Sequence, residues 1–349
     1  MAEQALAQVQ QTENGDVPRL VLKPIPVPRP AEHELLVKIS HTGQNPTDIQ
    51  SFDSNAFGNG AVLGCDFAGT VEATGEGVVR ALKGDVVAGL VWGGEKKGVG
   101  AYSQYSLANE YISFKVPESI TLAEAATVPL ASTTAWLALF SEGSLHMDRQ
   151  AGKDSVILVW GGSSSVGLYA IQFAALYGFK VVTTCNPRHF DRVKSLGANY
   201  AFDYRATDVI PSIKSVAPGL KHIFDTIGAS QSSATASQAI GEHGGVLCTV
   251  RPGKTNTAGL TERTRAVDVL VWTAFLKNHR YGEHFWPASK ADHALASELF
   301  HNLPVWLDAG TIKPSVPKIL KGLRSVAEGF EEYRSGIVSG YKIVYTIED

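Results

Sequence analysis

Hydrophobic and polar positions follow two different patterns along this chain, and the change comes near Pro117. Up to that residue, short apolar runs are separated by turns containing glycine or proline, which is typical of a compact, barrel-like β domain. The segment before the first strand is expected to be extended and unsuited to a helix or a central strand, because proline recurs at every second position from Pro24 to Pro30. Strands are expected at Glu34–His41, Val62–Glu72, Val86–Trp92 and Ala101–Leu107.

Strand and helix signals alternate after Pro117, which is the pattern of a parallel, doubly wound sheet. Thr121 and Glu124 have the spacing of a capping box and predict a helix start. Further helices are expected at Ser132–Ser141, Leu168–Gly178, Phe190–Leu196, Ser230–Ile240 and Asp292–Leu307. Strands are expected at Ser155–Trp160, Lys180–Cys185, Tyr200–Tyr204, His222–Ile227, Gly245–Val250, Asp268–Leu276 and Gly340–Ile347.

The stretch from Ser155 to Gly178 carries the clearest chemical signal in this second pattern. A buried strand, a Gly/Ser-rich loop and a helix follow one another, as in the first half of a dinucleotide-binding unit. Gly162 and Gly167 occupy the first and third glycine positions of the usual fingerprint, but Ser164 occupies the second. We therefore expect loop hydroxyls to donate to phosphate oxygens, and the alternative is a Gly/Ser-rich loop without a ligand. The expected cofactor residues here are Ser163, Ser164, Ser165 and Val166.

Composition narrows the class of protein and its partners. A length of 349 residues suggests about two domains, and 44% hydrophobic with 19% charged residues is typical of globular chains. The net charge of −3, without a long basic run, argues against nucleic acid or an anionic membrane as the main partner. No apolar stretch is long enough to span a bilayer and no signal peptide is evident. Three widely spaced cysteines fit a reducing cytoplasm and no disulfide framework.

The order of domains, together with several local motifs, resembles the medium-chain dehydrogenase/reductase superfamily over nearly the whole chain. More narrowly, it resembles the fungal trans-acting enoyl reductases that partner polyketide synthases. The resemblance implies a GroES-like, β-rich catalytic domain at 1–122, completed by 311–349, and a Rossmann NADP-binding domain at 123–310. The motifs are Asn45–Asp48, Ala101–Tyr105, Lys115–Pro117, Leu122–Pro129, Gly161–Gly167, Thr184–Pro187, Phe202–Arg205, Tyr281–Glu283 and Trp286–Pro287.

The sequence departs from the zinc branch of that superfamily. Zinc members carry a Cys where this chain has Asn45, and Gly-His-Glu where it has Gly64-Cys65-Asp66. A lone Cys65 beside Asp66 lacks the His and the second thiolate of a catalytic zinc site, and the four-cysteine structural lobe is missing. We therefore expect no bound metal.

The segment after Lys180–Cys185 lacks the acidic residue that holds the ribose hydroxyls in NAD enzymes. Nothing in Cys185–His189 repels a 2′-phosphate, and the Arg188 guanidinium is suited to bind it. NADP(H) is therefore the expected cofactor, and the alternative is that Arg188 is a solvated surface residue. Besides Arg188, the residues expected near this phosphate or the adenine are Asn186, Pro187, His189 and Tyr204.

The resemblance implies further segments beside the nicotinamide and its ribose. The loop Asn45–Asp48 is one, although Asn and Asp flanking Pro-Thr also suit an ordinary turn. The end of the strand at Gly245–Val250 and the segment before the last strand are the others. The residues implied are Asn45, Pro46, Thr47, Asp48, Thr249, Val250, Val338 and Ser339.

The substrate pocket is expected between the two domains, where such folds place ligands. One wall would come from Val128–Ala135, with Thr134 as the hydrogen-bond donor to the developing enolate; the alternative is that these hydroxyls only cap a helix. The other wall would come from Leu270–Phe275, where Trp272 is alternatively a core residue. The residues implied are Val128, Pro129, Leu130, Ala131, Ser132, Thr133, Ala135, Leu270, Val271, Trp272, Thr273, Ala274 and Phe275.

Three functions remain open on the sequence. The first is an NADPH-dependent reductase of a polyketide enoyl thioester, carried by a carrier protein of a partner polyketide or hybrid synthase. The second is a zinc-independent reductase of quinones or small enones, and the third is a catalytically silent NADP-binding regulator. We expect a monomer, because the charges, glycine and proline of Ala274–Pro287 would blunt the edge of the second sheet.

Overall fold

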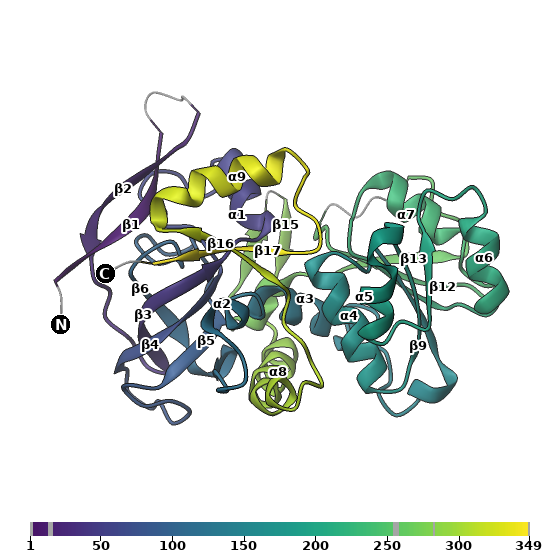
Figure 1. Ribbon diagram of the computed structural model, residues 1–349, viewed down its shortest axis with the longest axis horizontal. Helices are drawn as coiled ribbons and strands as arrows, with labels where there is room; N and C mark the ends of the chain where they lie inside the picture. The colour runs from purple at the N-terminus through teal and green to yellow at the C-terminus, as the bar shows by residue number, and fades with distance from the viewer. Residues whose placement is uncertain (1–2, 13–16, 254–257, 282, 348–349) are drawn as a thin grey trace. The chain divides into compact units, whose positions relative to one another are not determined.

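The computed structural model describes residues 3–12, 17–253, 258–281 and 283–347, and the chain forms two compact units (Figure 1). Unit 1 comprises Met1–Leu130, Phe300–Gly310 and Pro314–Asp349, and unit 2 comprises Ala131–Leu299 and Thr311–Lys313. The sequence-based division assigned 123–130 and 300–310 to the second domain, whereas the structure groups them with the first.

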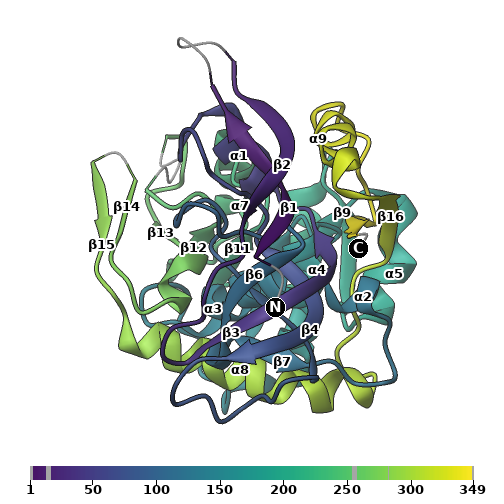
Figure 2. The same cartoon turned by 90° about the vertical axis from the view of Figure 1, so that its left-hand side faces the viewer.

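Unit 1 is built on a seven-stranded sheet whose strands carry runs of consecutive buried residues, such as Leu35–Val37 and Val87–Leu90. The strand order is β16-β17-β3-β4-β5-β7, and β6 also pairs with β3. A separate hairpin of β1 and β2 is seen in Figure 2. The strands are β1 (Gln4–Gln11), β2 (Arg19–Pro26), β3 (Glu34–Gly43), β4 (Asp66–Thr74), β5 (Val86–Leu90), β6 (Tyr105–Asn109), β7 (Ser113–Lys115), β16 (Pro317–Lys321) and β17 (Lys342–Thr346).

Apolar clusters of buried side chains stabilise unit 1, and the two described next are the larger ones. One packs around Leu36 and Phe67 in the sheet, and the other joins Tyr102, Phe330 and Tyr345. The second cluster contains residues from both the amino-terminal and the carboxyl-terminal parts of the sequence. Its helices are α1 (Pro46–Asp53) and α9 (Val326–Arg334); the short α2 (Leu122–Ala125), η1 (Glu110–Ile112) and η5 (Leu323–Ser325) complete the unit.

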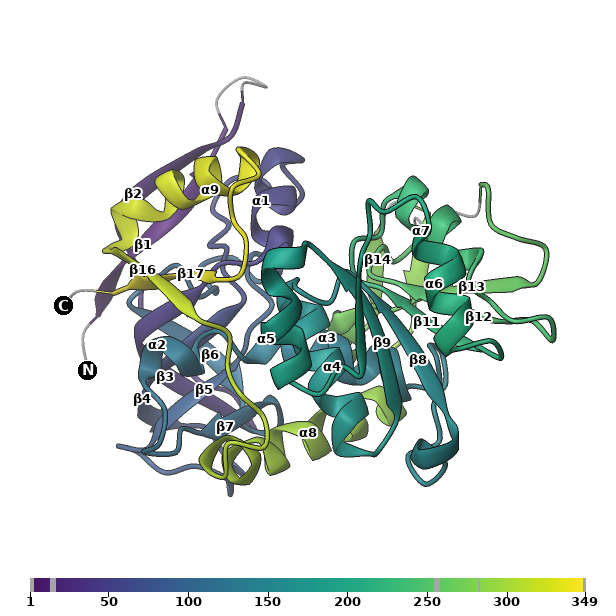
Figure 3. The same ribbon diagram turned by 45° about the vertical axis from the view of Figure 1, so that its right-hand side comes forward.

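Unit 2 contains a six-stranded parallel sheet, visible in Figure 3, as the sequence predicts. The order β10-β9-β8-β11-β12-β13 is that of a doubly wound Rossmann fold, with its switch point beside β8. The strands are β8 (Val156–Trp160), β9 (Lys180–Cys185), β10 (Tyr200–Asp203), β11 (His222–Asp225), β12 (Gly245–Thr249) and β13 (Thr264–Asp268). The helices are α3 (Pro129–Phe140), α4 (Ser165–Leu176), α5 (Phe190–Ser195), α6 (Val209–Val216), α7 (Ser230–Ser237) and α8 (Lys290–Asp308), with η2 (Gly152–Asp154), η3 (Pro187–His189) and η4 (Val271–Ala274). The first two residues of α3 and the part of α8 from Phe300 onwards belong to unit 1.

The structure corrects the prediction of a strand at Asp268–Leu276. The edge strand β13 ends where that prediction begins, and the apolar run turns instead into η4. Thr273 supports the turn by donating its hydroxyl to the Leu270 carbonyl at 2.9 Å. A short hairpin follows, made of β14 (His279–Tyr281) and β15 (His284–Trp286), which pairs only with itself among the described strands. The segment Ala274–Pro287 therefore does not form the edge of the large sheet.

For some other elements the sequence patterns predict a different first residue from the observed one, and some elements they do not predict. The strand expected at Ala101–Leu107 is β6, which begins at Tyr105, and the helix expected at Ser132 begins at Pro129. The spaced prolines did not prevent Arg19–Pro26 from pairing as β2 in a two-stranded ribbon. The patterns did not indicate α6, β16 or α9.

Candidate functional site

The loop between β8 and α4 is shaped by glycines and closed by Ser164. Gly161 adopts φ +87°, a conformation that favours glycine, and a Cβ on Gly162 would lie 2.0 Å from the Thr183 hydroxyl. Ser164 is the N-cap of α4: its Oγ accepts from the Gly167 N–H at 3.0 Å and donates to Thr226 Oγ1 at 2.8 Å. The Ser164 hydroxyl is thus engaged within the protein, contrary to the expectation that it serves the phosphate. Ser163, Ser165 and Val166 are half-buried at the start of this helix.

The carboxyl end of β9 carries Asn186–His189 in the short turn η3. Asn186 Oδ1 accepts from the Arg188 N–H at 3.1 Å, and Arg188 Nε donates to His189 Nε2 at 3.2 Å. The Arg188 and Pro187 side chains are exposed, whereas Asn186 and His189 are half-buried. Burial, with the nearby charges of Arg188 and Arg192, lowers the pKa of His189, so the imidazole is neutral at pH 7.

The neighbouring strand β10 brings a second cation to the same edge. Residues Asp203 and Cys185 are paired in register, so the loops that follow β10 and β9 lie side by side. The Arg205 guanidinium lies 4.8 Å from the centre of the Tyr204 ring, which is 41% exposed. Arg205 belongs to the motif Phe202–Arg205 but is not among the predicted site residues.

These features fit a nicotinamide dinucleotide. The N–H groups of Ser165 and Val166, at the first turn of α4, have no carbonyl partner within the helix and suit a pyrophosphate. The turn after β9 carries no carboxylate to repel a 2′-phosphate and does carry the exposed Arg188. At the end of β12, the buried Thr249 hydroxyl has no hydrogen-bond partner among the described residues, as expected of a group that meets a ligand. Val250 follows it, half-buried.

In unit 1, Asn45–Asp48 forms the start of α1 rather than an isolated turn. The Asp48 Oδ2 accepts from the Asn45 N–H at 2.8 Å and from the Tyr102 hydroxyl at 2.9 Å. The Asn45 side chain is buried and bonded to Asp66 and Lys342. Of the four predicted cofactor residues, only Pro46 is exposed and Thr47 half-exposed, so these two have surface to offer a ligand.

Asp48 and Tyr102 form a buried pair. Burial raises the pKa of Asp48 to about 6, against the opposing effect of hydrogen bonds from Asn45 and Tyr102. Burial and the Asp48 charge raise the pKa of Tyr102 well above its ordinary value. Tyr102 is fully buried against Phe330 and Tyr345, so its hydroxyl serves Asp48 and is not a surface proton donor.

The helix α3 carries the predicted donor Thr134. Because α3 begins at Pro129, the hydroxyls of Ser132, Thr133 and Thr134 lie beyond its first turn and none is the N-cap, which excludes the capping alternative. Ser132 and Thr133 are fully buried, while Thr134 and Leu130 keep 7% and 8% exposure. Leu130 and Thr134 are four residues apart and share one face of the helix. Val128, Pro129, Ala131 and Ala135 are buried.

The predicted second wall is the turn η4 and its flanks. Leu270, Val271 and Trp272 keep 7–9% exposure, and Ala274 is fully buried. The Trp272 and Phe275 rings lie 6.1 Å apart at 47°, and Phe275 and Thr273 are half-buried. In unit 1, the predicted Val338 and Ser339 are half-buried, and Val338 packs against the cluster of Tyr102 and Phe330.

Comparison with known proteins gives the family. Residues 31–118 match the alcohol dehydrogenase GroES-like domain, and residues 165–269 match the family described as zinc-binding dehydrogenase. A trans-enoyl reductase from Gibberella fujikuroi is 32% identical over 90% of this chain and 92% of its own length. The trans-enoyl reductase thnE from Trichoderma harzianum is 33% identical over 93% and 92%. The protein belongs to the medium-chain dehydrogenase/reductase superfamily.

The solved structures agree with this fold. An alcohol dehydrogenase superfamily protein from Novosphingobium aromaticivorans superposes with a TM-score of 0.80 at 24% identity, covering 99% of this chain and 100% of that one. As a medium-chain dehydrogenase/reductase with trans-enoyl reductase relatives, the protein is an oxidoreductase of a family that uses a nicotinamide cofactor.

At the positions compared with the zinc ligands of the superfamily, the side chains already have partners. Asp66 pairs with Lys342, Asn45 bonds to both, and burial raises the pKa of the Cys65 thiol well above its ordinary value. Within the described part of the chain, no group of three or more His, Cys, Asp or Glu is arranged to hold a metal. No described helix is both long and apolar enough to cross a membrane.

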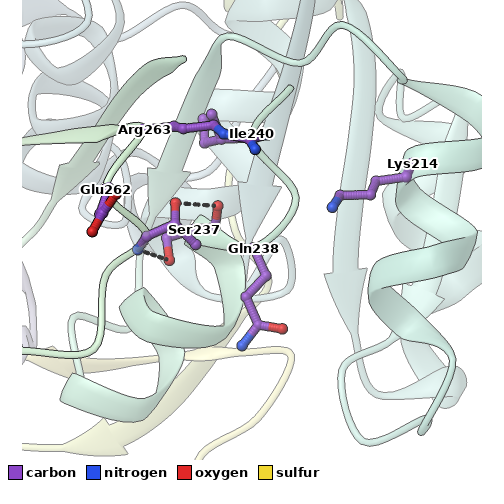
Figure 4. Close-up of a pocket in the computed structure, with 7 residues that line it drawn as sticks. Lys214, Ser237, Gln238, Ile240, Glu262 and Arg263 are labelled. Carbon is purple, nitrogen blue, oxygen red and sulfur yellow. Dashed lines mark hydrogen bonds between the residues drawn. The ribbon is translucent and has the colours of Figure 1, made fainter. Parts of the chain in front are cut away.

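A surface depression of about 470 Å³ lies elsewhere on unit 2 (Figure 4). It is lined by the end of α7, by Lys214 and by Thr261–Arg263, and Thr261 bonds to Ser237 beneath it. These residues precede β12 and β13, whereas members of this superfamily bind ligands at the carboxyl ends of the parallel strands. The depression contains none of the predicted site residues.

Proposed function

We propose that the protein is an NADPH-dependent trans-acting enoyl reductase. It reduces the α,β-double bond of an enoyl thioester held by the carrier protein of a separate polyketide or hybrid synthase. The observation that carries this proposal is the similarity to trans-enoyl reductases over nine-tenths of the chain. The exposed Arg188 after β9, with no carboxylate in that turn, supports NADPH rather than NADH.

Thr134 has the central chemical role. Bound NADPH supplies the hydride that adds to the β-carbon of the enoyl thioester. As the β-carbon accepts that electron pair, the π electrons move towards the thioester oxygen and leave an enolate. The Thr134 hydroxyl donates to this oxygen, and a donor fixed by a helix stabilises the charge more in the transition state than in the substrate. Leu130, on the same face of α3, supplies apolar surface beside it.

The proton for the α-carbon comes from solvent. Asp48 and Tyr102 are bonded to each other inside unit 1, and the pKa of about 6 leaves Asp48 mostly ionised at pH 7. Asp48 is therefore mostly unprotonated, and Tyr102, although protonated, donates its hydroxyl to Asp48 inside unit 1, so neither group is our candidate for the acid. The acyl chain lies against Trp272 and Phe275, whose rings offer flat apolar area.

The test is NADPH oxidation in three parallel assays: with crotonyl-CoA, with a simple quinone, and with neither. We expect oxidation that depends on the enoyl thioester and forms the saturated thioester, and slower oxidation when NADH replaces NADPH. Reduction of the quinone alone would instead identify a quinone reductase. Cofactor binding without turnover of any enoyl thioester, including one loaded on a carrier protein, would identify a regulator.

A further inference from the structure

A buried ion pair is bonded to the first turn of α3, the helix that carries Thr134. Lys342 Nζ of β17 is 2.5 Å from Asp66 Oδ2 of β4, and their side chains are 2% and 0% exposed. Lys342 also donates to the Thr127 carbonyl at 3.3 Å. Both charges have been taken out of water, which is costly unless each is closely partnered.

The pair is bonded to the segment that begins α1. Asn45 Nδ2 donates to Asp66 Oδ2 at 2.9 Å, and Asn45 Oδ1 accepts from Lys342 Nζ at 2.8 Å. The Asn45 side-chain amide is hydrogen-bonded to both members of the pair, so the orientation of this amide is fixed. The backbone of Asn45 is thereby fixed directly ahead of Pro46 and Thr47.

The other oxygen of the same carboxylate holds the beginning of α3. Asp66 Oδ1 accepts from the Leu130 N–H at 2.7 Å. Leu130 is the second residue of α3, so its N–H has no carbonyl partner within the helix, and a carboxylate there also meets the positive end of the helix dipole. Thr134 lies one turn further along the same helix.

We propose that Asp66, held in place by Lys342, is a positioning residue for the reductase reaction: its two oxygens fix Asn45 and the first turn of α3 together, and so set the direction of the Thr134 hydroxyl. This inference rests on the proposed function. A buried ion pair often adds little to the free energy of unfolding compared with apolar residues of similar size, so its use here is to fix geometry. A shift of about 1 Å in a positioned group can cost on the order of 100-fold in rate.

Two double variants of equal charge separate this role from a general structural one. Asp66→Asn with Lys342→Met removes both charges but keeps an oxygen to accept from Leu130. Asp66→Leu with Lys342→Met removes both charges and the acceptor, and keeps the number and branching of the side-chain heavy atoms. Lys318→Met is the matched control, because Lys318 on β16 is an exposed lysine that forms a different ion pair, with Glu332.

The measurements are kcat and KM with crotonyl-CoA, the thermal midpoint, and amide hydrogen exchange over residues 128–136. We expect the kcat of the Asn version to stay within about 3-fold of the parent value. The kcat of the Leu version should be roughly 10- to 100-fold lower than that of the Asn version, with little change in KM for NADPH. Exchange in the first turn of α3 should be faster in the Leu version than in the Asn version. Lys342→Arg, which keeps the charge and its donors, should retain most of kcat.

Equal kcat in the two double variants at a temperature where both are folded would overturn the proposal. A third double variant, Asp66→Val with Lys342→Met, also lacks the acceptor. If neither this variant nor the Leu version folds while the Asn version does, the proposal is likewise overturned, since the pair would then be purely structural. The exchange measurement needs no substrate. A parent enzyme that reduces no enoyl thioester would therefore refute the proposed function alone, while unchanged exchange would refute the positioning by Asp66.

Discussion

The hydroxyl of Thr134 is the single group on which the proposed chemistry depends most. Thr134→Val keeps the shape of the side chain and removes the donor. We predict a decrease in kcat of about 10²–10³-fold, as found when an oxyanion donor is deleted, with unchanged affinity for NADPH. Steady-state kinetics with crotonyl-CoA, together with cofactor titration by fluorescence, measure the two quantities. Turnover at the parent rate would remove Thr134 from the mechanism.

Arg188 is the residue that we expect to select NADPH. Its guanidinium is exposed after β9 and reaches no carboxylate in η3. Arg188→Ala should raise KM for NADPH by roughly 10-fold, because a charge-assisted bond to the 2′-phosphate is lost, and should leave KM for NADH nearly unchanged. Lys194→Ala, which removes an exposed cation from the neighbouring α5, is the control. An equal loss with both cofactors would contradict this assignment.

Asp48 should give the stability of the protein a recognisable pH dependence. Burial raises its pKa in the folded protein to about 6 from an ordinary value of 3.8, while Cys65, Tyr102 and Asp66 are its titratable neighbours. The folded state therefore binds the proton more tightly than the unfolded chain. The resulting stabilisation is fully present below pH 3.8 and is lost as the pH rises through 6.

Asp48→Asn cannot titrate and isolates this contribution. The free energy of unfolding of the parent, relative to the variant, should rise between pH 7 and pH 4 by about 2 kcal/mol. Urea unfolding of both proteins in the same buffers measures the difference, and contributions from other groups cancel. A difference that is the same at both pH values would show that Asp48 does not titrate in this window.

At the scale of elements, Ser164 caps α4, whereas its neighbour Ser163 is a serine that we expect to bind the cofactor. Ser164→Ala removes the acceptor for the Gly167 N–H and should lower the free energy of unfolding by about 1 kcal/mol. Ser163→Ala leaves the cap intact, so it should weaken NADPH binding without a comparable loss of stability. Urea unfolding and cofactor titration of both variants test this. Comparable loss of stability in both would contradict the distinction.

The elements that the sequence predicted well are those with strong periodicity. β9 was predicted with its observed bounds, because a buried parallel strand is a continuous apolar run between polar residues. The run Val269–Ala274 shows the same apolar character but lies beyond β13, and its η4 turn depends on local bonding that periodicity does not reveal. The position of Arg205 next to the turn after β9 could not be predicted, because it depends on the pairing of β10 with β9.

The change of pattern near Pro117 predicts that the chain forms two units, but it does not predict which later segments belong to each unit. The pairing of β17 with β3, and the bonds from Lys342 to Asn45 and Asp66, join positions nearly 300 residues apart in sequence. Composition and spacing carry no information on such contacts. The resemblance to a known family supplied the return of the carboxyl-terminal segment, and the residue pairs came only from the structure.

We predict that the protein is a monomer. The edge strand β13 is five residues long and carries the exposed Arg265, features that discourage pairing with a second sheet. Light scattering after size exclusion should give the mass of one chain. Arg265→Val tests the reason, because it should increase self-association. A stable dimer of the parent would contradict the prediction.

The distance in sequence between Asp66 and Lys342 has a consequence for biosynthesis. A ribosome delivers the amino-terminal part first, so Asp66 emerges 276 residues before the ammonium that neutralises it. Unit 2 has all its segments once Lys313 has been added, whereas unit 1 waits for β17 to complete its sheet. Vectorial synthesis therefore favours a nascent chain in which unit 2 has folded while the sheet of unit 1 is still open. A premature stop codon ahead of β17 would leave that open sheet as a substrate for proteases.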